Sequence, residues 1–207
     1  MSPDWIQAVA AVVQAIGVIF VAWQAILLRK QIGAEHELAR RTRAIDDLKT
    51  WSNALDRAHP AARRLVEDFT IEHCSQLIER KPFYISSQHA KLLEYALAGD
   101  LVDGELKKTE DGILLNERNL SHLLQLVCTH LNHLEVALQG WYNGIADSKI
   151  VVDQFKYVVS IKKGHYILER FRQHELVKDS YPAIAAFVAM LKKQAVGTVP
   201  TTRENVA

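Results

Sequence analysis

The sequence predicts an all-α fold in which a single N-terminal transmembrane helix continues into a stalk and a cytoplasmic helical bundle follows. Three observations predict this class. The 207 residues include only 9 glycines and 5 prolines, roughly 7% together against a usual ~12%, so few residues interrupt helices. A long uncharged segment lies near the N-terminus, and apolar residues recur at helical spacing along much of the remaining chain.

Composition and charge exclude several other classes of protein. Hydrophobic residues make up 49% of the chain, which is too many for a disordered protein. The 25 basic residues nearly balance the 24 acidic ones, whereas a dedicated nucleic-acid binder is usually strongly basic. Cys74 and Cys128 are too few for a secreted module held by disulfides and suit a reducing compartment. Nucleic acid is therefore not an expected partner.

The transmembrane helix is expected at residues 5–28, after a short external N-terminus of residues 1–4. The segment WIQAVAAVVQAIGVIFVAWQAILL holds no charged residue, and a helix needs about 20 mostly apolar residues to cross a bilayer. Trp5 and Trp23 lie roughly 27 Å apart along a helix, so they suit the two membrane interfaces. The segment is too long for a cleavable signal peptide, and no Lys or Arg precedes it. A buried core helix is the alternative.

Basic residues set the expected orientation of this helix. The residues before it include no Lys or Arg, whereas five basic residues follow it closely: Arg29, Lys30, Arg40, Arg41 and Arg43. The positive-inside rule places the more basic side in the cytoplasm. The lipid bilayer is thus the first expected partner, with the N-terminus outside and the domain in the cytoplasm.

One face of the predicted transmembrane helix carries polar and small residues, namely Gln7, Ala10, Gln14, Gly17 and Gln24. At about 100° per residue, these side chains lie within roughly 100° of one another, opposite the tryptophans. Small residues let helices approach closely in lipid, and amide side chains hydrogen-bond between helices. This membrane stripe predicts self-association, or pairing with another membrane helix. Three tolerated glutamines with no such role are the alternative.

The remaining chain is expected to form a stalk over residues 29–58, a cytoplasmic domain over residues 59–196 and a disordered tail over residues 197–207. Gly33 is the expected place for a bend in the stalk, Pro60 suits the first turn of a helix, and Asp147 suits an N-cap. Periodicity predicts helices over residues 60–81, 87–98, 113–139, 147–175 and 180–194, with a long loop at residues 99–112.

The candidate polar site consists of Asn132, Glu135 and Asp147. The first two lie on the flank of the apolar face of the predicted helix over residues 113–139, and buried polar groups need hydrogen-bond partners. One interpretation is a polar site that binds a small ligand or a partner. The other is a structural network that fixes the following turn, WYNGIAD, by bonding its backbone.

No catalytic residue, cofactor or metal site is expected. The sequence has nine histidines, but His122 and His133 are roughly 16 Å apart along a helix and do not share one ion. We therefore expect solvent-exposed histidines, His130 included. His36 begins a segment like the zinc-protease helix, but Arg40 replaces the second histidine ligand.

Two Arg–His pairs suggest a second kind of chemistry. Small helical nucleases of the HEPN class resemble this chain in size and helix content, and their motif separates Arg from His by four to six residues. The pairs Arg118–His122 and Arg170–His174 are separated by only three residues. A helical ribonuclease is therefore an alternative function, although the spacing of both pairs differs from that of the motif.

The stretch LVCTHLNHLEVALQGWYNGIADSKIVVDQF is similar to a widespread family of uncharacterised bacterial proteins. The similarity covers residues 120–175 best, and the matching positions are Leu131, Asn132, Glu135, Ala137, Gly144, Ile145 and Asp147. The resemblance implies an N-terminal helix in the bacterial inner membrane, a cytoplasmic helical region and an association with prophage or anti-phage contexts. It supplies no catalytic residues.

Together these features predict a non-enzymatic anchoring or sensing module. We expect it to form a homo-oligomer through the membrane stripe and to bind an unidentified cytoplasmic protein. The first alternative is an anti-phage or toxin-like effector that perturbs the membrane on oligomerisation, and the second is the helical ribonuclease.

Overall fold

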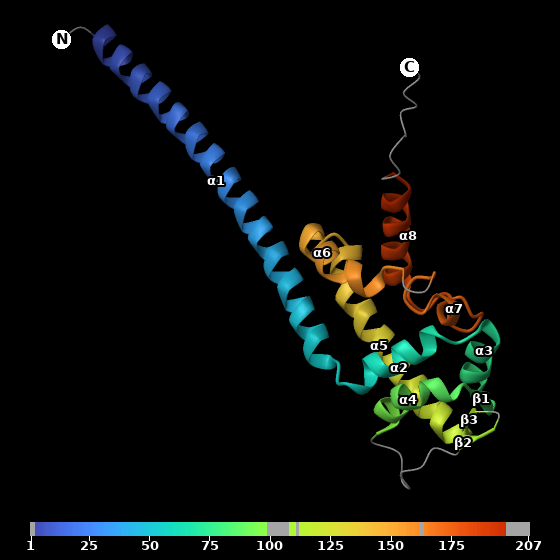
Figure 1. Ribbon diagram of the computed structural model, residues 1–207. Coiled ribbons are helices and arrows are strands. Elements are labelled where there is room, and N and C mark those ends of the chain that lie inside the picture. Colours follow the sequence, from blue (N-terminus) through green and yellow to red (C-terminus); the bar gives the residue numbers. More distant parts are fainter. Residues whose placement is uncertain (1–2, 99–107, 111, 162–163, 198–207) are drawn as a thin grey trace, which may run out of the picture.

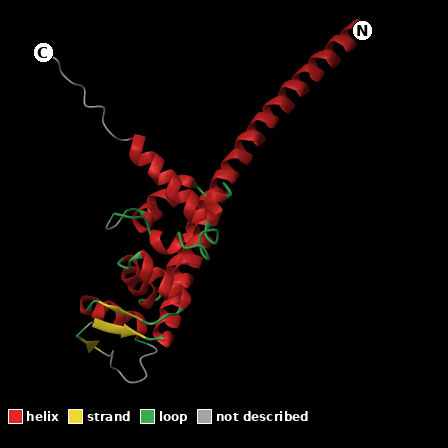
Figure 2. Ribbon diagram, turned by 90° about the vertical axis from the view of Figure 1, so that its right-hand side faces the viewer, coloured by secondary structure: helices red, strands yellow, loops and turns green. Residues whose placement is uncertain are grey.

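The computed structural model describes residues 3–98, 108–110, 112–161 and 164–197. Helices dominate these residues, and their strands form one small sheet (Figures 1 and 2). The predicted all-α class is confirmed, with that sheet as an addition. One long helix, α1 (Pro3–Ala54), projects from a bundle built by the other helices.

α1 runs without a break through the predicted membrane segment, Gly33 and the stalk. The expected bend at Gly33 does not interrupt the helix, and nothing packs within 4 Å of the position where its Cβ would lie. Among the described residues, α1 is the one helix long and apolar enough to cross a membrane, and its apolar part is not buried against the domain. The helix ends at Ala54, slightly earlier than expected, and Asp56 Oδ1 accepts hydrogen bonds from the next helix at 2.9 Å and 3.3 Å.

The bundle contains the helices α2 (Ala58–Glu67), α3 (Ile71–Glu79), α4 (Ala90–Leu97), α5 (Glu117–Tyr142), α6 (Ser148–Val159), α7 (Glu169–Arg172) and α8 (Pro182–Gly197). A short 3-10 turn, η1 (Ser87–His89), precedes α4. Polar side chains start three of these helices, because each accepts a backbone N–H that the first turn leaves free: Thr70 for α3, Asn116 for α5 and Asp147 for α6.

Part of the predicted loop over residues 99–112 and the predicted start of the long helix belong to a sheet. The strands are β1 (Phe83–Ile85), β2 (Lys108–Thr109) and β3 (Gly112–Leu115), ordered β1–β3–β2 and all antiparallel. A Cβ on Gly112 would lie 2.3 Å from the carbonyl oxygen of Ile85, and its φ of 124° favours glycine. The prediction of helix from residue 113 was therefore wrong, because pairing with β1 defines the strand and Asn116 caps α5 after it.

The predicted helix over residues 147–175 was also wrong in length. α6 ends at Val159, and the four-residue α7 follows only at Glu169. The chain between them turns back so that the backbone N–H of Ile167 donates to the carbonyl of Val159 at 3.2 Å. α8 extends past the expected residue 194, whereas residues 198–207 of the predicted tail lie outside the described residues.

α5 lies at the centre of the bundle and makes most of its contacts. α1, α2, α4, α6 and α8 all pack against it, and its apolar face is fully buried at Leu120, Leu123, Val127, Leu131, Leu134 and Leu138. α5 also runs antiparallel to the stalk, so its C-terminal end points toward the apolar half of α1 (Figure 1). This arrangement places the turn after α5 beside the stalk.

Candidate functional site at the junction of α1 and the domain

α1 joins the domain through one face of its C-terminal part. Ala44 is fully buried there, and Asp47 is 8% exposed. Trp51 packs its indole edge-on against Phe155 of α6, with the ring centroids 5.2 Å apart. The C-terminal end of the stalk is therefore part of the hydrophobic core. A single helix, α1, thus contains both the exposed apolar segment and a part of the domain core.

A buried carboxylate lies against the centre of this junction. Asp47 Oδ1 pairs with Arg43 Nε at 3.1 Å, whereas its Oδ2 has no hydrogen-bond partner among the described residues. Burial raises the pKa of Asp47, against the opposing effect of the Arg43 guanidinium. Gly140 of α5 makes room for the carboxylate, since a Cβ at that position would lie 2.5 Å from Oδ2. Only a glycine lets α5 pack this closely to Asp47.

The turn after α5 is fixed to the stalk by backbone hydrogen bonds. The N–H of Asp147 donates to the carbonyl of Arg40 at 3.1 Å, and the N–H groups of Ile145 and Ala146 both donate to Gly140. Asp147 then accepts the N–H of Ile150 at 3.0 Å and so caps α6. Asp147 thus links α1, the turn and α6, and its role here is structural.

A cleft of about 860 Å³ opens between α1 and this turn. Four stalk residues line one wall: Gly33, His36, Glu37 and Arg40. The other wall comes from the turn and the start of α6: Trp141, Gly144, Ala146, Asp147 and Ser148. Trp141 Nε1 donates to Ser148 Oγ at 3.1 Å across that wall. Both charge signs line the cleft, which suits a polar or zwitterionic group better than a simple ion.

The three residues of the predicted polar site, Asn132, Glu135 and Asp147, lie in separate parts of the structure. Glu135 reaches α8, where its carboxylate accepts the backbone N–H groups of Ala183 at 2.8 Å and Ile184 at 3.0 Å. Asp147 caps α6, as described above, and Asn132 is exposed on α5. Glu135 and Asp147 therefore each satisfy backbone groups of a different helix, and the three residues do not form one network.

His130 was expected in solvent and is instead buried, with 2% exposure. Neither ring nitrogen has a hydrogen-bond partner among the described residues, and the ring lies edge-on to Trp51 with centroids 6.3 Å apart. The expectation was wrong because it considered α5 alone, whereas α1 and α2 cover this face. Burial lowers the pKa of His130 to about 3, with a further contribution from nearby Arg63.

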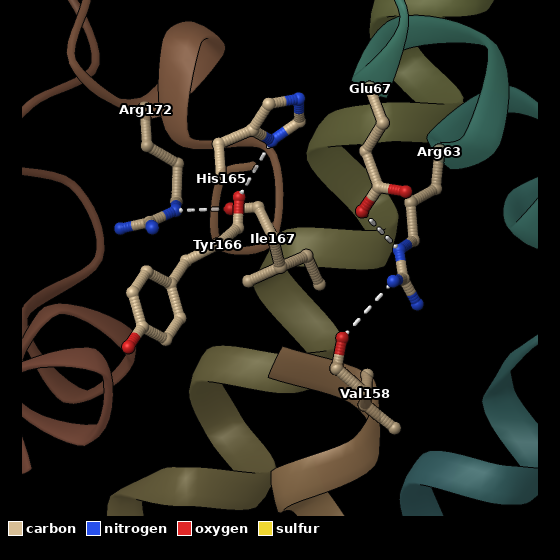
Figure 3. Close-up of polar contacts among 7 residues, drawn as sticks. All are labelled: Arg63, Glu67, Val158, His165, Tyr166, Ile167 and Arg172. Atoms are coloured by element: carbon tan, nitrogen blue, oxygen red, sulfur yellow. Dashed lines mark hydrogen bonds and ion pairs between the residues drawn. The ribbon is translucent and has the colours of Figure 1, made fainter. Parts of the chain in front are cut away.

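A buried ion pair ties α2 to the end of α6 (Figure 3). Arg63 Nε donates to Glu67 Oε1 at 2.9 Å, and Arg63 Nη2 donates to the carbonyl of Val158 at 3.0 Å. On the other side of the same view, Arg172 Nε donates to the carbonyl of Ile167 at 2.8 Å. These guanidinium groups satisfy backbone carbonyls at the ends of α6 and the following turn, which explains how the irregular segment after α6 is held.

The membrane stripe lies entirely on the exposed part of α1. Gln7, Ala10, Gln14, Gly17 and Gln24 are all exposed, and nothing packs near the position where a Cβ on Gly17 would lie. The domain covers none of this face, so the stripe is free to contact lipid or another helix.

The residues considered for catalysis are dispersed or have structural roles. Within the described ranges, no three His, Cys, Asp or Glu side chains are placed to hold a metal ion. Arg170 Nη1 donates to the carbonyl of Phe69 at 2.8 Å, and His174 Nδ1 accepts the N–H of Leu176 at 3.3 Å. The pair Arg170–His174 is therefore engaged with the backbone. At the other pair, Arg118 is exposed and His122 is half-buried.

No family model matches the chain, and no curated protein or solved structure is significantly similar to it. The resemblance of residues 120–175 to a family of bacterial membrane proteins therefore stays a prediction.

Sequence analysis missed the residues that build the junction. Neither Asp47 nor Gly140 was among the candidate residues. A signal for Gly140 exists, since a glycine within a strongly amphipathic helix costs about 1 kcal/mol relative to alanine and therefore suggests a close contact. No local signal identifies Asp47, because its burial results from α5 packing against it.

Proposed function

We propose that the chain is a membrane-anchored helical interaction or sensing module of the bacterial inner membrane. In this proposal residues 5–28 cross the bilayer once, the N-terminus is outside and the domain is cytoplasmic. Copies of the chain associate through the membrane stripe, and the domain binds a cytoplasmic protein. The observation that carries the proposal is the continuity of α1, whose apolar part is uncovered while its C-terminal end is part of the domain core.

This continuity supports sensing as well as anchoring. A flexible linker between membrane helix and domain would isolate the two, whereas an unbroken helix moves them together. Association or tilting of α1 in the bilayer therefore moves the domain as well, because the buried junction at Asp47 and Gly140 holds the two together.

The span itself is tested by washing membranes with alkaline carbonate. The full-length protein is expected to stay in the pellet, because a spanning apolar helix resists extraction that removes peripheral proteins. Its release into the supernatant would contradict the span. Labelling a cysteine placed at Ser2 with a membrane-impermeant reagent tests the orientation, and labelling only after the cells are opened would contradict an external N-terminus.

Association through the stripe is tested with a variant in which Gln7, Gln14 and Gln24 are replaced by Leu. The variant keeps the apolar length but loses the amide hydrogen bonds between helices, so we expect less cross-linked oligomer than in the wild type. The matched control places leucine at three exposed glutamines of the domain, Gln125, Gln139 and Gln154. An unchanged yield in the triple variant would remove the stripe from the proposal.

The alternative of a membrane-perturbing effector is supported by the same three exposed glutamines, which could line a polar path between assembled helices. Regulated expression with a membrane-potential dye distinguishes the two functions. An interaction module leaves the potential intact, whereas rapid depolarisation that the triple variant abolishes would favour the effector.

A further inference from the structure

We propose that two copies pair in parallel along the whole of α1, through a cytoplasmic face of the stalk as well as through the membrane stripe. We call this stalk face the Leu38–Ile45 face, formed by Glu35, Leu38, Thr42 and Ile45. The inference rests on the proposed function and extends it, because it identifies a second copy of the chain as the partner of a surface outside the membrane.

The stripe and the stalk face have the same seven-residue register. One series of positions is Gln7, Gln14, Val21, Leu28, Glu35 and Thr42, and the second is Ala10, Gly17, Gln24, Gln31, Leu38 and Ile45. Two series offset by three residues define the seam of a parallel coiled coil. Since α1 is unbroken from Pro3 to Ala54, pairing in the membrane carries the same face into the stalk.

The domain leaves this face free. The residues that dock α1 onto the bundle, Ala44, Asp47 and Trp51, lie roughly 170° around the helix from the Leu38–Ile45 face. Leu38 is 65% exposed and Ile45 is 43% exposed. Figure 1 shows the bundle on one side of α1. Two copies can therefore bring their stalks together while each bundle stays on the outside.

A shallow groove also follows the free face. Its volume is about 530 Å³, and its lining residues all belong to α1: Glu35, Leu38, Ala39, Thr42, Arg43 and Asp46. Its lining residues include the apolar Leu38 and the small Ala39, and small residues permit close approach of a second helix.

Charges on either side of the seam fit a second copy in parallel orientation. In a parallel pair, the residue at position 41 of one helix lies beside position 46 of the other. These residues are Arg41 and Asp46, which have opposite charges. Within its own chain Arg41 pairs with Glu37 and lies 3.8 Å from Asp147 Oδ2, so Asp46 of the second copy would share the Arg41 guanidinium with these carboxylates. The next such positions toward the membrane are Ala34 and Ala39, which are both small. Two copies inserted with the same orientation are parallel by necessity.

One residue opposes this pairing and so provides a diagnostic test. Glu35 would face Glu35 of the second copy, and like charges across a seam repel. Within each chain Gln31 Nε2 donates to Glu35 Oε1 at 3.2 Å, which solvates the carboxylate without removing its charge. Glu35→Ile should therefore strengthen association, but only if the two faces meet.

The inference is tested by cysteine cross-linking of the full-length protein in native membranes. The background carries Cys74→Ala and Cys128→Ala, and single cysteines replace Leu38, Ile45, His36, Glu37 or Gly17. We expect disulfide-linked dimer on mild oxidation at positions 38 and 45. His36 and Glu37 are exposed on other faces of the same helix, so they serve as controls and should give little dimer.

The cysteine at position 17, in the predicted membrane segment, distinguishes failure of the inference from failure of the proposed function. Dimer at 17 without dimer at 38 and 45 would overturn the inference and leave membrane association intact. Absence of dimer at positions 17, 38 and 45 would overturn both the inference and the proposed association in the membrane. Equal yields at 36, 37, 38 and 45 would indicate random collision and also overturn the inference.

The second measurement compares Glu35→Ile with His36→Ile in the Leu38→Cys background. Pairing through the proposed face predicts a several-fold rise in dimer yield for Glu35→Ile and none for His36→Ile, because His36 is exposed on another face of the helix. An unchanged yield for Glu35→Ile, or an equal rise for both variants, would contradict the inference.

Discussion

The buried imidazole of His130 contributes to the response of the domain to acid. His130 is neutral in the folded state because burial lowers its pKa to about 3, whereas in the unfolded chain it titrates near 6.5. Below about pH 6.5, His130 therefore binds a proton in the unfolded state but not in the folded state. Stability linked to His130 is fully present above pH 6.5 and falls as the pH decreases toward 3.

We expect His130→Phe to make the domain less sensitive to acid. The wild type should lose about 2 kcal/mol of unfolding free energy between pH 6.5 and pH 5 through this residue, and the variant should not. Phenylalanine keeps the ring against Trp51 and removes two nitrogens that lack partners, so stability at pH 7.5 should not fall. Unfolding of the detergent-solubilised protein at the two pH values measures this, with His36→Phe on the exposed stalk as control. Equal acid sensitivity in wild type and His130→Phe would contradict the assigned cause.

Replacement by alanine is expected to have opposite effects on stability at two helical glycines, Gly140 and Gly33. Gly140→Ala forces a methyl group into the space of the Asp47 carboxylate, and overpacking of this kind costs about 1–3 kcal/mol. At Gly33 nothing lies within 4 Å, so Gly33→Ala should be neutral or stabilise α1 by up to about 1 kcal/mol. Thermal unfolding of the two variants checks both signs. A stabilised Gly140→Ala protein would show that Asp47 moves aside without cost.

At the scale of elements, Glu135 controls whether α8 stays on the bundle. Its carboxylate accepts two backbone N–H groups at the start of α8, and Trp141 holds Phe187 one turn further along, with ring centroids 4.9 Å apart. The carboxylate of α5 thus acts as the acceptor that a capping side chain would supply to the first turn of α8.

Glu135→Ala is expected to destabilise the docking of α8 by about 1–3 kcal/mol, because two buried N–H groups lose their acceptor. Hydrogen exchange should show faster exchange in α8 than in α2, which serves as an internal control. Glu135→Gln keeps one acceptor oxygen and should have an intermediate effect. Uniform loss of protection over the whole domain would indicate global unfolding instead of release of α8.

Sequence reasoning succeeded for elements whose signal is local. α1, α5 and α8 were predicted because uncharged length, amphipathic period and a Pro start are properties of adjacent residues. It failed at residues 113–115 and after Val159, where the structure depends on partners far along the chain: β1 for the strand, and Arg63 for the end of α6. The prediction of one helix over residues 60–81 was also wrong, because α2 ends at Glu67 and Thr70 caps a separate helix, α3. The polar residues show the same limit. The sequence indicated that Glu135 needs hydrogen-bond partners, but it did not indicate that these partners are backbone N–H groups of α8.

At the scale of the whole molecule, the boundary between the candidate membrane segment and the domain lies within α1. Removing residues 1–28 should leave a soluble protein that unfolds cooperatively, because Ala44 is the first fully buried residue among the described side chains of α1. Removing residues 1–57 also removes Asp47 and Trp51 and exposes the faces of α5 and α6 that they cover. We expect that shorter protein to aggregate or to lose cooperative unfolding in circular dichroism melts. If it folds as well as the longer fragment, the end of the stalk is not part of the core.

In the proposed membrane-spanning state, the unbroken α1 transmits a change in its inclination to the domain. Asp47 lies 19 residues after Leu28, or roughly 28 Å along the helix axis. A change of about 10° in the inclination of the helix at the bilayer therefore displaces the docking point sideways by roughly 5 Å. An apolar segment longer than the hydrocarbon layer adjusts by inclining, and the adjustment depends on bilayer thickness. Thinning or thickening of the membrane would thus reach the domain as a lateral displacement, with no chemical signal needed.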